Sequence, residues 1–152
     1  LRIWQLGLGF ASTAVLHALV KAGVIEQMRE RTRTLPELAG ACGLNVDVLH
    51  RILRSAGVMG VVQDHGGHYS LTETGTLLLK DVPGSLYMGI LLVGSEPWQR
   101  GWQNLTHSLV TGETAFDPVM GDPFFAYLDK HPEYGIPYHQ RRSSAHYCKV
   151  QV

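Results

Sequence analysis

The sequence predicts a mostly α-helical fold that contains a winged helix with a small β-hairpin wing. Three observations lead to this fold class. Residues 46–56 carry apolar side chains at every third or fourth position, which is the spacing of one buried helix face. Thr34 and Glu37 have the spacing of a capping box, in which each side chain satisfies a backbone N–H group at a helix start. Two β-prone runs follow, and the paired glycines between them suit a hairpin turn.

Residues 1–33 are predicted to form the first helices. The apolar residues of the stretch 1–23 occur on more than one side of a helix, so this helix needs cover from more than one direction. Its Gly7-Leu8-Gly9 sequence partly matches the glycine pattern of a dinucleotide-binding loop. Such a loop must follow a hydrophobic strand, and no strand pattern precedes these glycines. We therefore interpret them as a site of helix packing or a kink.

Residues 34–80 form the predicted winged-helix segment. Its first helix begins at Thr34, and glycines at positions 40 and 43 provide the signals that end it. Asn45 is the predicted N-cap of the second helix, which corresponds to the recognition helix of a winged helix. Gly57 is the predicted end of that helix.

The wing is predicted to consist of two short strands, residues 58–63 and 69–71, joined by a turn over residues 64–68. Glycines inside that turn supply the positive φ angles that a tight hairpin requires. Thr72 is then expected to begin another helix, which extends through residue 79. The predicted order is helix, helix, strand, strand, helix.

Residues 81–140 are predicted to be a helical segment. After a turn, Ser85 is expected to cap an apolar helix, and Pro97 begins a further helix that ends at Gly112. A loop over residues 113–122 leads to a short helix over residues 123–128.

The segment after this short helix has a weaker pattern. Gly135 and Pro137 are expected to break regular structure, and residues 141–152 have no apolar periodicity. The sequence therefore predicts an irregular tail over residues 141–152.

Composition narrows the class of protein. The chain has 152 residues, of which 45% are hydrophobic, and this is enough to bury a substantial core. Thirteen basic residues balance thirteen acidic ones, so no overall positive field would hold the chain to nucleic acid or to an anionic membrane. Cys42 and Cys148 form no CxxC pair, and no apolar run is long enough to span a bilayer. We expect a cytoplasmic protein with no membrane or nucleic-acid partner.

Candidate chemical sites in the sequence are few. Asp64, His65 and His68 offer three donors on the wing, but an exposed polar hairpin is the simpler interpretation. His139, His146 and Cys148 match no structural zinc spacing, and His146 with Cys148 is near in sequence only, which defines no catalytic geometry. We therefore predict no metal-binding, cofactor-binding or catalytic residue in this chain.

Several sequence stretches together resemble one enzyme family. These are the winged-helix segment, the helix with Trp98 and Trp102, the TGETAFD loop and the GDPFFAYL helix. Their order and spacing resemble the amino-terminal half of S-adenosylmethionine-dependent small-molecule O-methyltransferases, of the plant caffeate and bacterial polyketide type. The resemblance implies a helical dimerisation domain that forms a homodimer through its N-terminal helices. It also implies natural-product biosynthesis as the setting.

The resemblance further implies that this half of the enzyme covers the pocket for the methyl acceptor, an aromatic or polyketide small molecule. An apolar, aromatic pocket can orient such a substrate without transferring a proton itself. Val93 and Gly94 would lie near the opposite wall. The positions that match the acceptor-facing residues of the family are Trp98, Phe124, Leu128, Tyr134 and Tyr138.

The sequence also departs from this family. It contains neither the acidic, glycine-rich loop that binds the methyl donor nor the catalytic histidine. We therefore expect a chain truncated before the catalytic domain, with no cofactor of its own, although the full-length family uses S-adenosylmethionine.

Two alternative functions remain open from the sequence. The chain could be a stand-alone small-molecule-binding or assembly protein derived from a methyltransferase. It could also be a DNA-binding regulator, since His50, Arg51 and Arg54 lie on the predicted recognition helix. Asp47 on that helix and Asp64 on the wing oppose phosphate binding.

Overall fold

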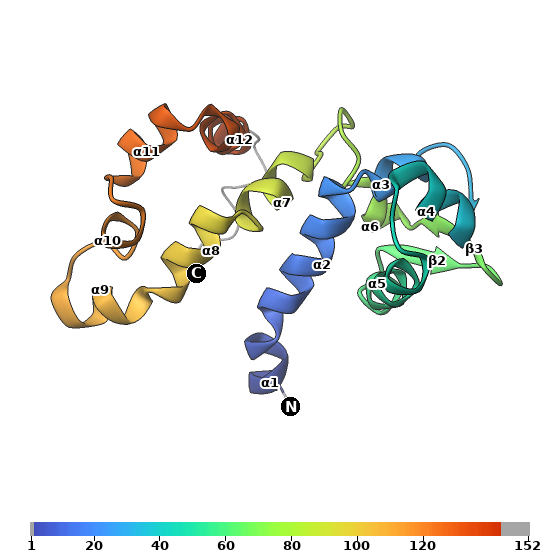
Figure 1. Ribbon diagram of the computed structural model, residues 1–152, viewed down its shortest axis with the longest axis horizontal. Coiled ribbons are helices and arrows are strands. Elements are labelled where there is room, and N and C mark those ends of the chain that lie inside the picture. Colours follow the sequence, from blue (N-terminus) through green and yellow to red (C-terminus); the bar gives the residue numbers. More distant parts are fainter. Residues whose placement is uncertain (1, 144–152) are drawn as a thin grey trace. The chain divides into compact units, whose positions relative to one another are not determined.

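A computed structural model describes residues 2–143 of the chain. The chain divides into two compact units, residues 1–90 and residues 91–152. The described residues are mostly helical and include one sheet of three short strands, which confirms the predicted fold class (Figure 1). Among them, no helix combines the length and the apolar character needed to cross a bilayer.

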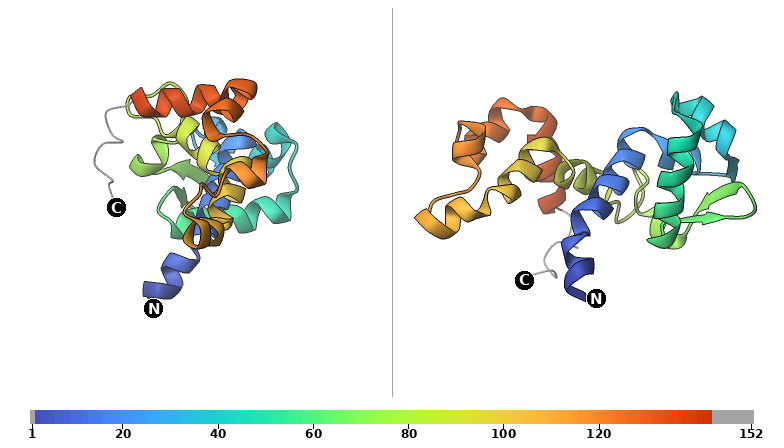
Figure 2. Two further views of the ribbon diagram at one scale, coloured as in Figure 1. Left: turned by 90° about the vertical axis from the view of Figure 1, so that its left-hand side faces the viewer. Right: turned by 60° about the horizontal axis from the view of Figure 1, so that its bottom comes forward.

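The first unit begins with two helices in place of the single predicted one. Helix α1 (Arg2–Gly7) and helix α2 (Gly9–Lys21) are separated at Leu8, within the Gly7-Leu8-Gly9 sequence. Glycine is a poor helix former, and two of them flank this break. In both views of Figure 2, α1 (blue) projects away from the winged helix of its unit. The short helix α3 (Val24–Gln27) then follows Gly23, whose φ is 77°.

The two predicted helices of the winged helix are present with their predicted caps. Helix α4 (Leu35–Cys42) begins with a complete capping box, in which the N–H of Thr34 donates to Glu37 Oε2 at 2.7 Å. Helix α5 (Val46–Val58) is capped by Asn45, whose side chain accepts the N–H of Val48 at 3.0 Å. The predicted end of α5 at Gly57 is wrong, because the helix continues to Val58 and the positive φ of 72° occurs at Gly60.

The wing is an antiparallel hairpin of β2 (Val62–Asp64) and β3 (His68–Leu71), so the predicted start of the first strand at residue 58 is wrong. Gly66 and Gly67 have φ of 70° and 91°, as the predicted turn requires. A third strand, β1 (Arg33–Thr34), pairs with β3 on the other side and gives the order β1-β3-β2. The sequence did not predict β1, because two residues carry no readable alternation.

The core of the first unit lies between these elements. Helix α5 is amphipathic and contacts α2, α4 and β2, and it contributes Leu49, Leu53 and Ala56 to the interior. Helix α6 (Glu73–Thr76) is capped by Thr72, as predicted, but it ends at Thr76 and does not extend through residue 79. The most completely buried large side chains of this unit are Leu19, Val20, Val24, Ile25, Leu38 and Leu53.

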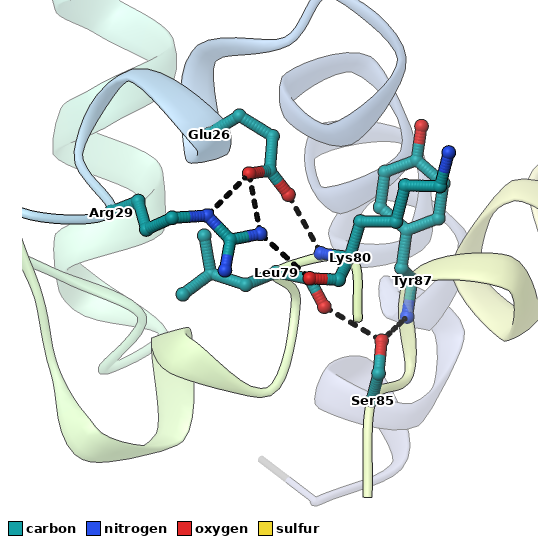
Figure 3. A network of polar contacts seen from close by, with 6 residues as sticks. All are labelled: Glu26, Arg29, Leu79, Lys80, Ser85 and Tyr87. Carbon is teal, nitrogen blue, oxygen red and sulfur yellow. Dashed lines mark hydrogen bonds and ion pairs between the residues drawn. The ribbon is translucent and has the colours of Figure 1, made fainter. Parts of the chain in front are cut away.

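A polar network ties the end of the winged helix back to α3 (Figure 3). The guanidinium of Arg29 donates to Glu26 Oε2 at 2.7 Å and to the carbonyl of Lys80 at 2.6 Å. The N–H of Lys80 in turn donates to Glu26 Oε1 at 2.6 Å. The hydroxyl of Ser85 donates to the carbonyl of Leu79 at 2.7 Å. These bonds fix the segment through which the chain leaves the winged helix.

Helix α7 (Tyr87–Val93) contains the boundary between the two units. The predicted cap is present, since Ser85 Oγ accepts the N–H of Tyr87 at 3.2 Å. Its side chains are mostly half-buried, and Leu92 is fully buried.

The second unit continues with α8 (Glu96–Gln103) and α9 (Leu105–Thr111), which the sequence predicted as one helix ending at Gly112. Asn104 separates them, and its side-chain amide donates to the carbonyl of Ala115 at 3.0 Å. The predicted loop contains a short helix, α10 (Asp117–Met120). A four-residue helix is too short to show a periodic pattern.

The second unit ends with α11 (Phe124–Lys130) and α12 (Pro132–Ser143). The expectation that Gly135 and Pro137 break regular structure is wrong. Pro132 occupies the favourable first position of α12, and Pro137 removes only one intrahelical hydrogen bond. Residues 141–143 are therefore helical, and the remainder of the predicted irregular tail lies outside the described residues.

Candidate functional site

The first candidate site is an apolar face on the two N-terminal helices. Five large apolar side chains of this segment are exposed, and Ile3, Trp4 and Phe10 are 84%, 71% and 66% accessible. Exposed apolar side chains gathered in one segment are costly to leave in water, so this segment is a candidate interaction surface. The five exposed side chains lie on more than one side of these helices, and we call them together the N-terminal apolar face: Ile3, Trp4, Leu6, Leu8 and Phe10.

The second candidate site is an aromatic cluster in the second unit. Trp98 of α8, Phe124 of α11 and Tyr138 of α12 meet one another, with ring centroids 5.6 Å, 6.0 Å and 5.2 Å apart for the three pairs. The rings are tilted or edge-to-face, which is the favourable geometry for aromatic pairs. Three of the five sequence-predicted acceptor-facing residues are thus in one cluster.

The other two predicted residues have different surroundings. Leu128 is buried, and its carbonyl oxygen would lie 2.7 Å from a Cβ placed on Gly135, so α11 and α12 pack closely at this point. Tyr134 stacks near Tyr127, with ring centroids 6.2 Å apart, and Tyr127 stacks on His131 at 4.1 Å. Burial, followed by the nearby negative charge of Glu133, raises the pKa of Tyr134.

The two residues predicted near the opposite wall precede α8. Val93 and Gly94 are half-buried. The backbone carbonyl of Val93 accepts a hydrogen bond from the side-chain amide of Gln99 at 2.5 Å. This bond attaches the start of α8 to the end of α7.

Phe116 extends the aromatic cluster, although the sequence interpretation did not assign it to the site. Its ring lies 5.1 Å from that of Phe124 and 5.3 Å from that of Tyr127, both edge-to-face. Gly101 of α8 makes room for it, because a Cβ at this position would lie only 3.2 Å from Cδ2 of Phe116. Phe116 is the aromatic residue of the TGETAFD loop, and this could have indicated that it belongs to the aromatic cluster.

A groove of about 550 Å³ opens along this cluster, and we call it the aromatic groove. Its volume lies in the range of small-molecule sites, roughly 300–1,000 Å³. Trp102 and Phe125 line it and are about 60% accessible. Its lining consists of Trp98, Gly101, Trp102, Leu105, Ser108, Thr114, Ala115, Phe116, Asp117, Pro123, Phe124 and Phe125. Of the sequence-predicted residues, Trp98 and Phe124 are in this lining.

The groups weighed as metal ligands have other contacts. On the wing, His65 Nε2 lies 3.1 Å from Ser70 Oγ, and Asp64 Oδ1 accepts the N–H of Gly67 at 2.7 Å. Within the described residues, no three His, Cys, Asp or Glu side chains are grouped as a metal would need. His146 and Cys148 lie outside the described residues.

Comparisons with known proteins agree on one family. Residues 4–81 match the family model described as "O-methyltransferase dimerisation domain". The chain is 32% identical over 130 residues to a phenazine O-methyltransferase of Lysobacter antibioticus, covering 85% of this chain and 38% of that protein. It is 33% identical over 133 residues to the O-demethylpuromycin-O-methyltransferase of Streptomyces alboniger, covering 87% of this chain and 35% of that protein.

Solved structures give the same result. The crystal structure of LaPhzM matches with a TM-score of 0.87 at 29% identity, over 93% of this chain and 43% of that one. The mitomycin 7-O-methyltransferase MmcR matches with a TM-score of 0.85 at 27% identity, over 94% of this chain and 43% of that one. The chain thus spans about two fifths of the length of the proteins it matches.

Proposed function

Because this chain belongs to the O-methyltransferase dimerisation-domain family, we propose that it forms a homodimer through α1 and α2 and helps to bind the methyl acceptor. In the whole enzyme, a methyl group would pass from S-adenosylmethionine to a hydroxyl of an aromatic or polyketide small molecule. The observation that carries the proposal is the N-terminal apolar face, which lies almost entirely within the matched residues 4–81.

Dimerisation follows from the cost of exposed apolar surface. Each large apolar side chain that leaves water contributes about 1.5–3 kcal/mol when it is fully buried. A two-fold symmetric contact would cover the same face on both copies at once.

The acceptor role is supported by the aromatic cluster of the second unit. Trp98, Phe124 and Tyr138 offer large flat surfaces at low cost in side-chain entropy, and a planar acceptor can stack on them. We propose Leu128 and Tyr134 as further acceptor-facing residues, and Val93 and Gly94 as positions near the opposite wall. In this assignment the chain orients the acceptor and performs no proton transfer.

We also propose that the methyl donor binds outside residues 1–152. The support is the coverage, since the matched methyltransferases have more than half of their length beyond the region shared with this chain. Isothermal titration calorimetry of the chain with S-adenosylmethionine should show no heat of binding. Saturable micromolar binding would contradict this assignment.

Light scattering tests the dimer directly. We expect twice the chain mass of 16.8 kDa for the wild-type protein and a single chain mass for the double variant Trp4→Glu/Phe10→Glu. The matched control is Val58→Glu, which places the same charge on a residue that is 92% accessible but lies outside the N-terminal apolar face. A monomeric wild type, or a dimer that survives the double substitution, would refute the proposed interface.

A further inference from the structure

We propose that the aromatic groove binds a planar aromatic molecule that carries a positively charged nitrogen, with the ring on the aromatic wall and the nitrogen at Asp117. The inference rests on the proposed acceptor role of the second unit, and it adds the charge of the ligand.

The wall of the groove suits a flat, electron-poor or cationic ring. Trp98, Phe116 and Phe124 line it, and Phe124 packs edge-to-face with each of the other two rings. Ring faces carry the negative part of the aromatic quadrupole and attract cations, and Trp does so most strongly. A groove of about 550 Å³ has room for a molecule of two or three fused rings.

Asp117 is held in place at one edge of this wall. The hydroxyl of Thr114 donates to Asp117 Oδ1 at 2.8 Å. The same hydroxyl accepts the backbone N–H groups of Phe116 and Asp117, at 3.2 Å and 3.3 Å. The turn therefore orients the carboxylate, and no group of the described residues donates a hydrogen bond to its second oxygen, Oδ2.

The charge of the groove is set by Asp117. Of the described residues that line the groove, Asp117 is the only one with an ionisable side chain. Two basic residues of the same unit are engaged elsewhere, because Arg100 pairs with Glu96 at 3.5 Å and Lys130 pairs with Asp122 at 2.6 Å. A cationic ligand would therefore gain a charge-assisted hydrogen bond, whereas an anionic ligand would be repelled.

Fluorescence titration with two matched dyes tests the inference. The probes are 9-aminoacridine, which is cationic at neutral pH, and acridine-9-carboxylate, which is anionic and has the same ring system. For the wild-type chain we expect the cation to bind at least roughly tenfold more tightly, which is the ratio that one charge-assisted hydrogen bond supplies. Added salt should reduce this preference, because the site is open to solvent.

Three variants locate the effect. Asp117→Asn keeps the acceptor for Thr114 and should abolish the preference for the cation, whereas Asp129→Asn, an exposed position on α11, should leave it unchanged. Phe125→Ala should weaken both dyes, because Phe125 lines the groove, and its 59% accessibility means that the fold should tolerate the change.

The outcomes distinguish this inference from the function on which it rests. If both dyes bind equally, or if Asp117→Asn keeps the preference while circular dichroism shows a folded chain, the charge assignment is wrong and the acceptor role stands. If neither dye binds, the proposed acceptor role of the second unit is itself refuted.

Discussion

Among the glycines of the first unit, Gly75 is the one where an added Cβ would come closest to another backbone atom. A Cβ at this position would be 2.0 Å from the carbonyl oxygen of Val61, which is a backbone atom and cannot rotate away. We therefore expect Gly75→Ala to push α6 away from the residues before β2 and to lower the free energy of unfolding by at least about 1–3 kcal/mol. Urea denaturation monitored by circular dichroism measures this change.

Gly40→Ala is the matched control for this substitution. Gly40 also lies inside a helix, α4, but a Cβ there would have nothing within 4 Å. Replacing a helical glycine with alanine at an open position should raise the free energy of unfolding by roughly 0.5–1 kcal/mol. If both substitutions destabilised the chain equally, the contact with Val61 would not be the cause.

Glu37 makes the folding stability of the winged helix depend on pH. Its pKa is below the ordinary value of 4.5, first because the backbone N–H of Thr34 donates to its carboxylate and then because the Thr34 hydroxyl does. A carboxyl with a lower pKa in the folded state than in the unfolded state stabilises the fold above the unfolded value. This contribution is lost as the pH falls through the folded pKa.

Glu37→Gln tests this contribution. Glutamine can keep the capping hydrogen bond but cannot titrate, so the variant should lose less stability than the wild type between neutral pH and pH values below 4.5. Thermal unfolding of both proteins across this range provides the comparison. Parallel losses in the two proteins would show that the capping carboxylate does not contribute.

Helices α11 and α12 depend on one glycine for their contact. A Cβ on Gly135 would lie 2.7 Å from the carbonyl oxygen of Leu128, so Gly135→Ala must separate the two helices. Tyr138 of α12 would then move away from Phe124 of α11. We expect loss of the near-ultraviolet circular dichroism of the aromatic cluster, with most helical signal retained. Ile136→Ala, at an exposed position of α12, should leave that spectrum unchanged.

The same helices show what the sequence could and could not predict. Elements with local chemical signals were predicted well, such as the caps at Thr34 and Asn45 and the turn at Gly66 and Gly67. The two-residue strand β1 and the four-residue helix α10 were missed because they are too short for a periodic pattern. The residues around Pro137 are helical in a helix that packs against α11. The rule that proline interrupts a helix considers only neighbouring residues and does not account for this packing.

The residues of the candidate site also include some that the sequence analysis predicted and some that it missed. The resemblance to the methyltransferase family implied Trp98 and Phe124 as acceptor-facing residues, and both line the aromatic groove. Phe116 and Asp117 were missed because their roles depend on the space left by Gly101 and on the turn at Thr114. The contact of Gly101 with Phe116 joins segments that a linear pattern does not connect, whereas Thr114 and Asp117 are only three residues apart. The individual acceptor-facing residues therefore remain predictions.

At the scale of the whole molecule, the proposed dimerisation is assigned to the first unit and the proposed acceptor binding to the second. The first unit matches the family model and carries the N-terminal apolar face, and the second carries the aromatic groove. If the dimer forms through α1 and α2, folding and association are linked, because dissociation would expose these helices to water. The stability of the chain is then inseparable from its concentration.

We therefore expect the melting temperature of the wild-type chain to rise with protein concentration. For a dimer that dissociates as it unfolds, each tenfold increase in concentration favours the folded dimer by about 1.4 kcal/mol. Differential scanning calorimetry over a hundredfold range of concentration should show a steady upward shift. Trp4→Glu/Phe10→Glu should melt at a lower temperature that does not vary with concentration, whereas Val58→Glu should behave like the wild type. A concentration-independent transition in the wild type would mean that the N-terminal apolar face does not couple folding to association.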